Sequence, residues 1–207
     1  EVIGGVAIPA LLLYMAPIFV MIMSFFFFHE KLNKQKILAL IMTIIGLCFI
    51  TGAFSQEVNL SGKAILLGLG AGFGYALYSI FSKMIIDKYE AVTIITYTFI
   101  VATIGSIPLS GVIYHVDELL SLQAIIAIIG LAIFCTVMPF LLYTTGLKKL
   151  EAGKASILAT IEPIVSAIVG LIFFQEVFDL TKILGMICII SAILILNLNL
   201  VKAKSVN

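Results

Sequence analysis

Long apolar segments separated by short charged ones dominate the sequence. Seven predominantly apolar segments run for about 20 residues each, which is the length an α-helix needs to cross the hydrocarbon core of a bilayer. They are residues 6–28, 37–54, 64–86, 91–114, 122–147, 155–174 and 183–201. Apolar residues are continuous within each segment and do not alternate with polar ones, so the pattern favours helices over membrane strands. The sequence therefore predicts an all-α, polytopic membrane helical bundle.

The lysines between these segments gather on one side of the predicted bundle. Ten of the twelve lysines fall on the same face: Lys31, Lys34, Lys36, Lys83, Lys88, Lys148, Lys149, Lys154, Lys202 and Lys204. The opposite face holds the other two lysines and a set of acids: Lys63, Lys182, Glu57, Asp117, Glu118, Glu176 and Asp179. Lysine-rich loops stay on the cytoplasmic side of a membrane. We therefore expect a protein of the cell (plasma) membrane whose C-terminus is cytoplasmic.

The chain also repeats itself at an offset of 146 residues, without a gap. The matched polar and proline positions are Pro17 with Pro163, Glu30 with Glu176, and Lys36 with Lys182. By the lysine count, Glu30 lies on the cytoplasmic face and Glu176 on the other, so the second copy of this helix pair is inverted. Inverted repeats are typical of carriers that work by alternating access. Gene duplication in a membrane protein without transport is the alternative.

The repeat predicts a domain organisation. Residues 1–60 form the end of the first repeat with two helices, residues 61–201 form the second repeat with five, and residues 202–207 form a cytoplasmic tail. Spans three to five have no counterparts before Glu1. The expected complete unit is therefore an inverted five-plus-five repeat, of which this chain lacks the first three helices.

Composition agrees with a lipid environment and excludes several function classes. Hydrophobic residues make up 62% of the chain, charged residues 11%, and the mean hydropathy is +1.25; soluble domains carry about 25% charged residues. The net charge of +1 and the absence of a basic aromatic patch give no support for nucleic-acid binding. No phosphate-binding loop, catalytic grouping or metal-ligand spacing appears. We predict no enzyme activity, no cofactor and no metal.

Glu162 is the sharpest functional candidate. It lies eight residues beyond Lys154, which is about 12 Å along a helix and near the middle of the bilayer. A carboxylate at that depth is costly unless it is paired, protonated or facing water. It either binds a cationic substrate or a coupling proton, or it fixes helix packing as a protonated or hydrogen-bonded group.

Other candidates share the pattern of polar or helix-breaking residues inside apolar segments. Tyr75, Tyr78 and Ser79 lie on one face of a helix and indicate either a cavity lining or hydrogen bonds between helices. Weaker candidates of the same kind are Tyr14, Tyr97 and Tyr143. The breaks or hinges expected within spans are Pro17, Pro139 and Pro163, where proline frees the carbonyl four residues earlier. Glu30 and Glu176, which carry the repeat, are expected to cap helices or pair with lysines; a gate role is the alternative.

The residues that carry the repeat also carry a family resemblance. Residues 13–17 (LYMAP) followed by 25–32 (FFFFHEKL) resemble the fourth helix of the EamA domain, from the drug/metabolite transporter superfamily. Residues 157–163 (ILATIEP) followed by 173–176 (FFQE) resemble its ninth helix, and residues 146–154 (GLKKLEAGK) resemble the link before that helix. The resemblance covers essentially the whole chain as helices four to ten. It implies a ten-helix carrier that moves small metabolites, often outward.

Repeat and resemblance together predict a secondary active transporter, an exporter of small metabolites or drugs. The expected partners are a small-molecule substrate, the lipid bilayer and a coupling proton or ion. A non-transporting integral membrane protein, either an assembly partner or an inactive fragment, is the alternative. A scaffold would need large soluble loops, and the longest loop here has about ten residues, so the carrier is favoured.

Overall fold

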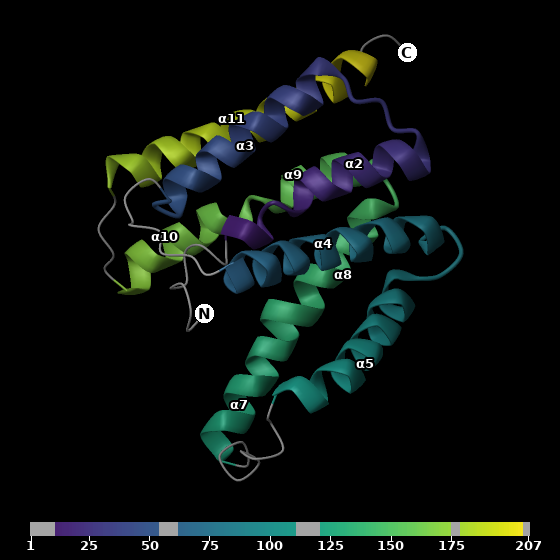
Figure 1. The fold of residues 1–207 in the computed structure, drawn as a ribbon, viewed down its shortest axis with the longest axis vertical. Helices are drawn as coiled ribbons and strands as arrows, with labels where there is room; N and C mark the ends of the chain where they lie inside the picture. Colours follow the sequence, from purple (N-terminus) through teal and green to yellow (C-terminus); the bar gives the residue numbers. More distant parts are fainter. Residues whose placement is uncertain (1–10, 54–61, 111–120, 175–178, 205–207) are drawn as a thin grey trace. The chain divides into compact units, whose positions relative to one another are not determined.

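The computed structural model of the chain describes residues 11–53, 62–110, 121–174 and 179–204. Every regular element in these ranges is a helix (Figure 1). In chain order they are α2 (Ala16–Phe28), α3 (Lys34–Ile50), α4 (Gly62–Ile85), α5 (Ala91–Ser110), α7 (Leu122–Gly130), the π-helix η2 (Leu131–Val137), α8 (Met138–Leu147), α9 (Ala152–Ala159), α10 (Glu162–Phe174) and α11 (Leu180–Lys204). The outward apolar surface is large, with Leu66 73% and Phe173 74% exposed, as expected for a protein surrounded by lipid.

Within the described residues, six helical segments are long and apolar enough to cross a membrane: residues 11–28, 62–85, 91–108, 122–147, 152–173 and 180–197. The predicted all-α, polytopic class is therefore confirmed. The remaining predicted span, residues 37–54, overlaps the 17-residue helix α3, which is about 26 Å long at 1.5 Å per residue. That is slightly shorter than a hydrocarbon core of about 30 Å. For this reason α3 is not one of the six helices that are long enough to cross a membrane. The end of the predicted span, Phe54, lies outside the described residues.

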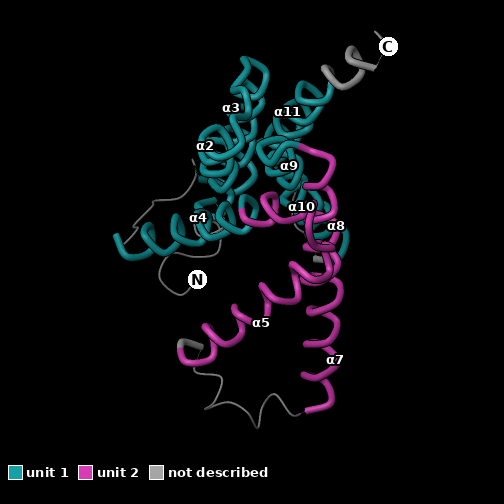
Figure 2. Tube along the Cα trace, turned by 90° about the vertical axis from the view of Figure 1, so that its right-hand side faces the viewer, with its two compact units in different colours: residues 1–80, 151–207 teal, residues 81–150 magenta. Residues whose placement is uncertain are grey.

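The chain divides into two compact units, shown in different colours in Figure 2. One unit contains residues 1–80 and 151–207, and the other contains residues 81–150. This division follows contacts in space, with its boundaries inside α4 and just before α9. The predicted boundary between residues 60 and 61 belongs to the sequence repeat instead, and it stays a prediction.

In the first unit, α3 and α11 lie side by side along their lengths (Figure 1). They approach most closely at Gly46 and Gly185: a Cβ atom added to Gly46 would lie 2.7 Å from the Gly185 carbonyl oxygen, and one added to Gly185 would lie 2.6 Å from the Gly46 oxygen. Small residues allow such backbone contact between membrane helices. Leu47 and Ile189, both fully buried, fill the space beside the crossing.

A second contact in this unit joins α2 to α9. Small side chains line it: Ala16 and Ser24 on α2, Ala152, Ala155 and Ser156 on α9, all buried. Because short side chains separate the two helices, their backbones approach closely. The α2–α9 contact therefore joins one helix from each half of the predicted repeat.

Glu30 caps α9 from the other half of the repeat. His29 ends α2 in the left-handed backbone conformation, with φ 53°, and Glu30 follows directly. The Glu30 carboxylate accepts the N–H of Ala152 at 2.8 Å and that of Gly153 at 3.3 Å. These are the first two residues of α9, where N–H groups lack helical partners and the helix dipole favours negative charge. The sequence prediction that Glu30 caps a helix or pairs with lysine describes this geometry.

Charged neighbours surround the capping carboxylate. Lys36 Nζ lies 3.5 Å from Glu30 and 3.1 Å from Glu151, and the Lys36 and Glu30 side chains are only 3% and 7% exposed. Lys154 Nζ lies 2.8 Å from Glu151, on the more exposed side of the cluster. We call Glu30, Lys36, Glu151 and the first two amides of α9 the Glu30 cluster. Buried charges are tolerated when opposite charges and N–H donors surround them in this way.

In the second unit, α5 packs against α8, and the rings of Phe99 and Phe140 meet edge to face at 5.1 Å. Lys83 donates to the carbonyl oxygens of Leu147 at 2.6 Å and Leu150 at 2.9 Å. A cation at the C-terminal end of α8 complements the carbonyls left unpaired there.

Replacing Gly185 by alanine is expected to destabilise the protein by about 1–3 kcal/mol, the usual cost of overpacking. The added Cβ would meet backbone atoms of Gly46 and Ile50, which cannot rotate away. The matched control is Gly70→Ala on α4, where no atom lies within 4 Å and helix propensity predicts a gain of up to about 1 kcal/mol. Thermal unfolding in detergent measures both variants. An equal or higher unfolding temperature for Gly185→Ala would disprove a tight crossing.

The Glu30 cluster also predicts a pH dependence of stability. Burial raises the pKa of Glu151, but hydrogen bonds from Lys154 and Lys36 outweigh it, so the net pKa is lower than its ordinary value of 4.5. A lowered pKa in the folded state stabilises the protein above the unfolded-state pKa, and that stabilisation is lost as the pH falls through the folded-state pKa. Glu151→Gln should therefore reduce the loss of thermal stability below pH 4.5, whereas Asp87→Asn, at an exposed carboxylate, should not. Identical pH profiles for wild type and Glu151→Gln would contradict this.

Candidate substrate site

Two helices of the first unit break at equivalent positions of the repeat. The first break is a turn at Tyr14 and Met15, just before α2 and Pro17. The Met15 N–H donates to the Leu12 carbonyl at 3.2 Å, and the Ile18 N–H donates to Met15 at 3.0 Å. Pro17 has no N–H, so the helical pattern cannot continue through it.

The second break has the same backbone hydrogen bonds as the first, 146 residues later in the chain. Thr160 and Ile161 form a turn between α9 and α10, just before Pro163. The Ile161 N–H donates to the Leu158 carbonyl at 3.2 Å, and the Ile164 N–H donates to Ile161 at 3.0 Å. Each of these bonds joins the residues equivalent to those in the first break, so the predicted span 155–174 is two helices with a turn between them.

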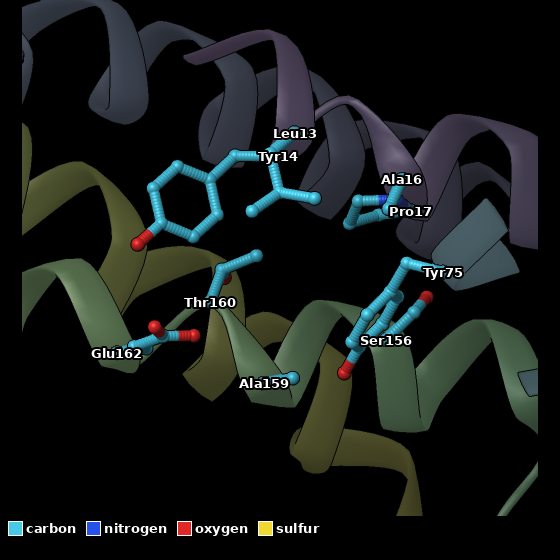
Figure 3. Close-up of a pocket in the computed structure, with 9 residues that line it drawn as sticks. All are labelled: Leu13, Tyr14, Ala16, Pro17, Tyr75, Ser156, Ala159, Thr160 and Glu162. Carbon is cyan, nitrogen blue, oxygen red and sulfur yellow. The ribbon is translucent and has the colours of Figure 1, made fainter. Parts of the chain in front are cut away.

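A pocket lies between the two breaks (Figure 3). Its lining residues are Leu13, Tyr14, Ala16, Pro17, Tyr75, Ser156, Ala159, Thr160 and Glu162. Three repeat-related pairs contribute both of their members: Leu13 with Ala159, Tyr14 with Thr160, and Ala16 with Glu162. The pocket is therefore where the two halves of the repeat meet at their matched breaks.

The polar ends of the lining residues fall into two groups. In Figure 3 the Glu162 carboxylate and the Tyr14 hydroxyl lie toward the same end of the pocket, and the Tyr75 hydroxyl and Ser156 lie toward the other. Glu162 is exposed, whereas Ser156 and Thr160 are buried. Their hydroxyls donate within α9, from Ser156 to Gly153 at 2.9 Å and from Thr160 to Ile157 at 2.6 Å, and their oxygen lone pairs remain able to accept.

The position of Glu162 explains how a carboxylate is accommodated in an apolar segment. Glu162 is the first residue of α10, where the positive end of the helix dipole stabilises a negative charge. Its side chain is exposed and is not packed into the protein interior. A membrane carboxylate that is exposed in this way faces water, a substrate or further protein.

The pocket has a volume of about 50 Å³. A water molecule needs about 10–15 Å³ measured in this way, so the pocket holds a few waters. Sites for drug-sized ligands measure about 300–1,000 Å³. The pocket is therefore smaller than a usual site for a drug-sized ligand.

The other candidate residues lie elsewhere. Ser79 is buried on α4 and donates to the Tyr75 carbonyl at 3.0 Å, and Tyr78, one residue earlier, does not line the pocket. Tyr97, 67% exposed, and Tyr143 belong to the second unit. Glu176 lies outside the described residues.

Pro139 follows a different kind of irregularity. It is the second residue of α8, directly after the π-helix η2, in which the Met138 N–H donates to Ile133, five residues earlier. In a π-helix each N–H donates to the carbonyl five residues earlier instead of four. The helix here therefore changes its hydrogen-bond pattern directly before Pro139. The predicted span 122–147 is thus continuous through Pro139, unlike the segments around Pro17 and Pro163.

The second unit has a larger, more open hollow of about 500 Å³ between α5 and α8. Its lining carries no charged side chain: Val92, Ile95, Thr96, Phe99, Ile100, Thr103, Ile104, Val137 and Leu141. Neither Tyr97 nor Tyr143 lines it. A lining of this composition suits an apolar group and offers no fixed charge for orienting a polar one.

Of the predicted site residues, the structure thus brings together Glu162, Tyr14, Tyr75 and Pro17. The sequence pattern does not single out Ser156 or Thr160, because hydroxyl side chains are common on membrane helices. One signal could have found Thr160: it stands 146 residues after Tyr14, at the same place in the repeat.

Known proteins with similar sequences are described as transporters. The chain is 30% identical over 190 residues to an uncharacterized transporter of Archaeoglobus fulgidus, covering 92% of this chain and 66% of that protein. It is 25% identical over 189 residues to the uncharacterized transporter YetK of Bacillus subtilis, covering 86% and 56%. The chain thus spans less than two thirds of the length of these relatives.

A solved crystal structure shares the fold. It superposes with a TM-score of 0.76 over 91% of this chain and 65% of that one, at 16% sequence identity. The profile of the EamA-like transporter family matches residues 2–52 and 62–198, which confirms the resemblance seen in the sequence. Because this match covers nearly the whole sequence, the chain belongs to the EamA-like transporter family.

Proposed function

We propose that the protein is a secondary active transporter that moves a small molecule by alternating access around the pocket of Glu162, Tyr14 and Tyr75. One observation carries this proposal: two repeat-related helix breaks line one pocket, and each half contributes equivalent positions. In carriers with inverted repeats, substrate and ion sites lie where broken helices of the two halves meet.

The chain is an integral, multi-pass membrane protein, because six of its helices can cross a bilayer and its family consists of transporters. The orientation is a proposal that rests on the lysines: ten lie on one face if α3 also crosses the membrane. Its packing along α11, one of the six, supports that. Lys34, exposed at the start of α3, can reach the interface by snorkelling. The proposed location is the plasma membrane, with the C-terminus on the cytoplasmic side.

Glu162 gives the proposed site its polarity. Its repeat counterpart is Ala16, so the pocket carries a carboxylate on one side only. A single exposed carboxylate near the Tyr14 hydroxyl, with the Tyr75 hydroxyl toward the other end of the pocket, suits a cationic substrate group or a coupling proton. Export is the proposed direction, and the complete transporting unit is proposed to contain ten helices in a five-plus-five arrangement.

Transport by purified protein in proteoliposomes tests the proposal. With an imposed pH gradient, uptake is measured for labelled amino acids, nucleosides and the cationic dye ethidium. We expect at least one class to be moved, and Glu162→Gln to slow its transport about tenfold or more, as loss of a charge-assisted contact predicts. Glu90→Gln is the control, since Glu90 is exposed and outside the pocket. No transport of any class by wild type would overturn the proposal, and full proton dependence in Glu162→Gln would exclude the proton role.

The helix break itself can be tested through Pro163. Pro163→Ala restores an N–H that can reach the Ala159 carbonyl, so α9 and α10 are expected to join and to narrow the pocket. Transport should fall while the thermal unfolding temperature holds or rises. Pro108→Ala, inside α5 of the second unit, removes a helix proline away from the pocket and should leave transport unchanged. Equal transport by Pro163→Ala and wild type would show that the break is dispensable.

A further inference from the structure

The Glu30 cluster lies at one end of the α2–α9 contact, and the pocket lies at the other. Gly153, which donates to Glu30, is six residues before Ala159, which lines the pocket; that is about 9 Å along α9. Ser156, three residues after Gly153, also lines the pocket and is 2% exposed. A molecule that passed between α2 and α9 on its way to the pocket would have to pass the Glu30 cluster first.

The cluster adds ion pairs and hydrogen bonds to an apolar contact between the two halves, in which Met21 of α2 packs in one cluster with Ile157 of α9. Glu30 lies in the loop between α2 and α3, Lys36 lies in the first turn of α3, and Glu151 precedes Ala152 and Gly153, the first residues of α9. A Cβ atom on Gly153 would lie 3.2 Å from Met21 and 3.3 Å from the Glu30 carboxylate, so the backbone of α9 comes up close to α2. Water can replace ionic and hydrogen-bonded contacts of this kind when the helices separate, at a small net cost.

The α3–α11 contact between the halves depends on close packing of backbones instead of on charge. At the α3–α11 crossing, backbone atoms of Gly46 and Gly185 face each other without room for a side chain. Such close packing resists sliding and can serve as a pivot, because any displacement loses contact along both helices. The ion pairs and hydrogen bonds of the Glu30 cluster can therefore be released while the α3–α11 crossing stays closed.

We propose that the Glu30 cluster is a latch: it closes the path from the pocket to the membrane face on which Lys31 and Lys34 lie, and it parts when the carrier turns toward that face. This proposal rests on the proposed function, since it assumes that the pocket is reached from each face in turn. The repeat places Lys182 and Glu176 at the positions equivalent to Lys36 and Glu30. Glu176 lies outside the described residues, and the latch proposal concerns the Glu30 cluster only.

The latch is tested by the accessibility of a cysteine at position 156. Ser156→Cys is introduced into protein in which Cys48, Cys135 and Cys188 are replaced by alanine. A membrane-impermeant maleimide is then applied to vesicles of each orientation. We expect slow labelling from the face of Lys31 in this background. Adding Glu30→Gln should speed labelling from that face by about 10- to 100-fold, as loss of one buried charge-assisted contact predicts, with no change from the opposite face.

Three controls separate a latch from a structural role. Asp87→Asn removes an exposed carboxylate of the second unit and should leave labelling unchanged. Lys36→Met should act like Glu30→Gln, and it replaces that variant if Glu30→Gln does not fold. The exchange Glu30→Lys with Lys36→Glu restores the ion pair but not the acceptor for the α9 amides, so labelling should remain fast; slow labelling would overturn the role of the helix cap.

The outcomes distinguish the latch from the proposed function. Unchanged labelling in folded Glu30→Gln and Lys36→Met, or an equal increase from both faces, overturns the latch even if the protein transports. Faster labelling from the face of Lys31 alone supports the latch, and faster labelling from the opposite face alone overturns it. If the wild type moves no substrate in proteoliposomes, the proposed function falls, and the labelling still reports whether the Glu30 cluster closes this path.

Discussion

A helix that crosses a bilayer has to hydrogen-bond its own backbone, because lipid offers no donors or acceptors. Pro17 and Pro163 make this impossible at one carbonyl in each of two helices. Both segments have the same local structure, with a turn just before the proline and the same pair of backbone hydrogen bonds. Breaks of this kind are tolerated only where protein or a cavity receives the freed backbone groups, and here they enclose a pocket together. The position of the candidate site follows from this constraint.

The α3–α11 crossing and the Glu30 cluster both join the halves of the repeat, and they differ in kind. The α3–α11 crossing depends on the absence of side chains at Gly46 and Gly185, so its stability comes from close packing. The Glu30 cluster depends on a carboxylate that accepts two amides of α9 and pairs with Lys36. A movement between the halves is cheapest where polar groups can exchange partners with water and costliest where backbones interlock. A rigid pivot and a releasable end within one unit are what a rocking motion requires.

Charge placement in the apolar part of the chain follows helix ends. Glu30 binds at the start of α9, Glu162 begins α10, and Lys83 binds carbonyls at the end of α8. Each charge lies where unpaired backbone groups have the opposite partial charge. The same arrangement that stabilises Glu162 leaves its carboxylate exposed at the pocket, where it is available to a ligand.

The sequence alone determined the helical class, most of the helix boundaries, the repeat and its two prolines, because apolar length and proline chemistry act locally. It also selected Glu162 through the cost of a carboxylate in lipid. Only the tertiary structure decided that Tyr14 and Tyr75 share a pocket with Glu162 whereas Tyr78 does not line it, that Ser156 and Thr160 join them, and that Glu30 caps α9. Helical periodicity assigns a residue to a face, but which neighbour that face meets depends on how helices far apart in the chain pack. A carboxylate at a helix end likewise has many positive partners in the sequence, and only folding brings one of them within hydrogen-bond distance.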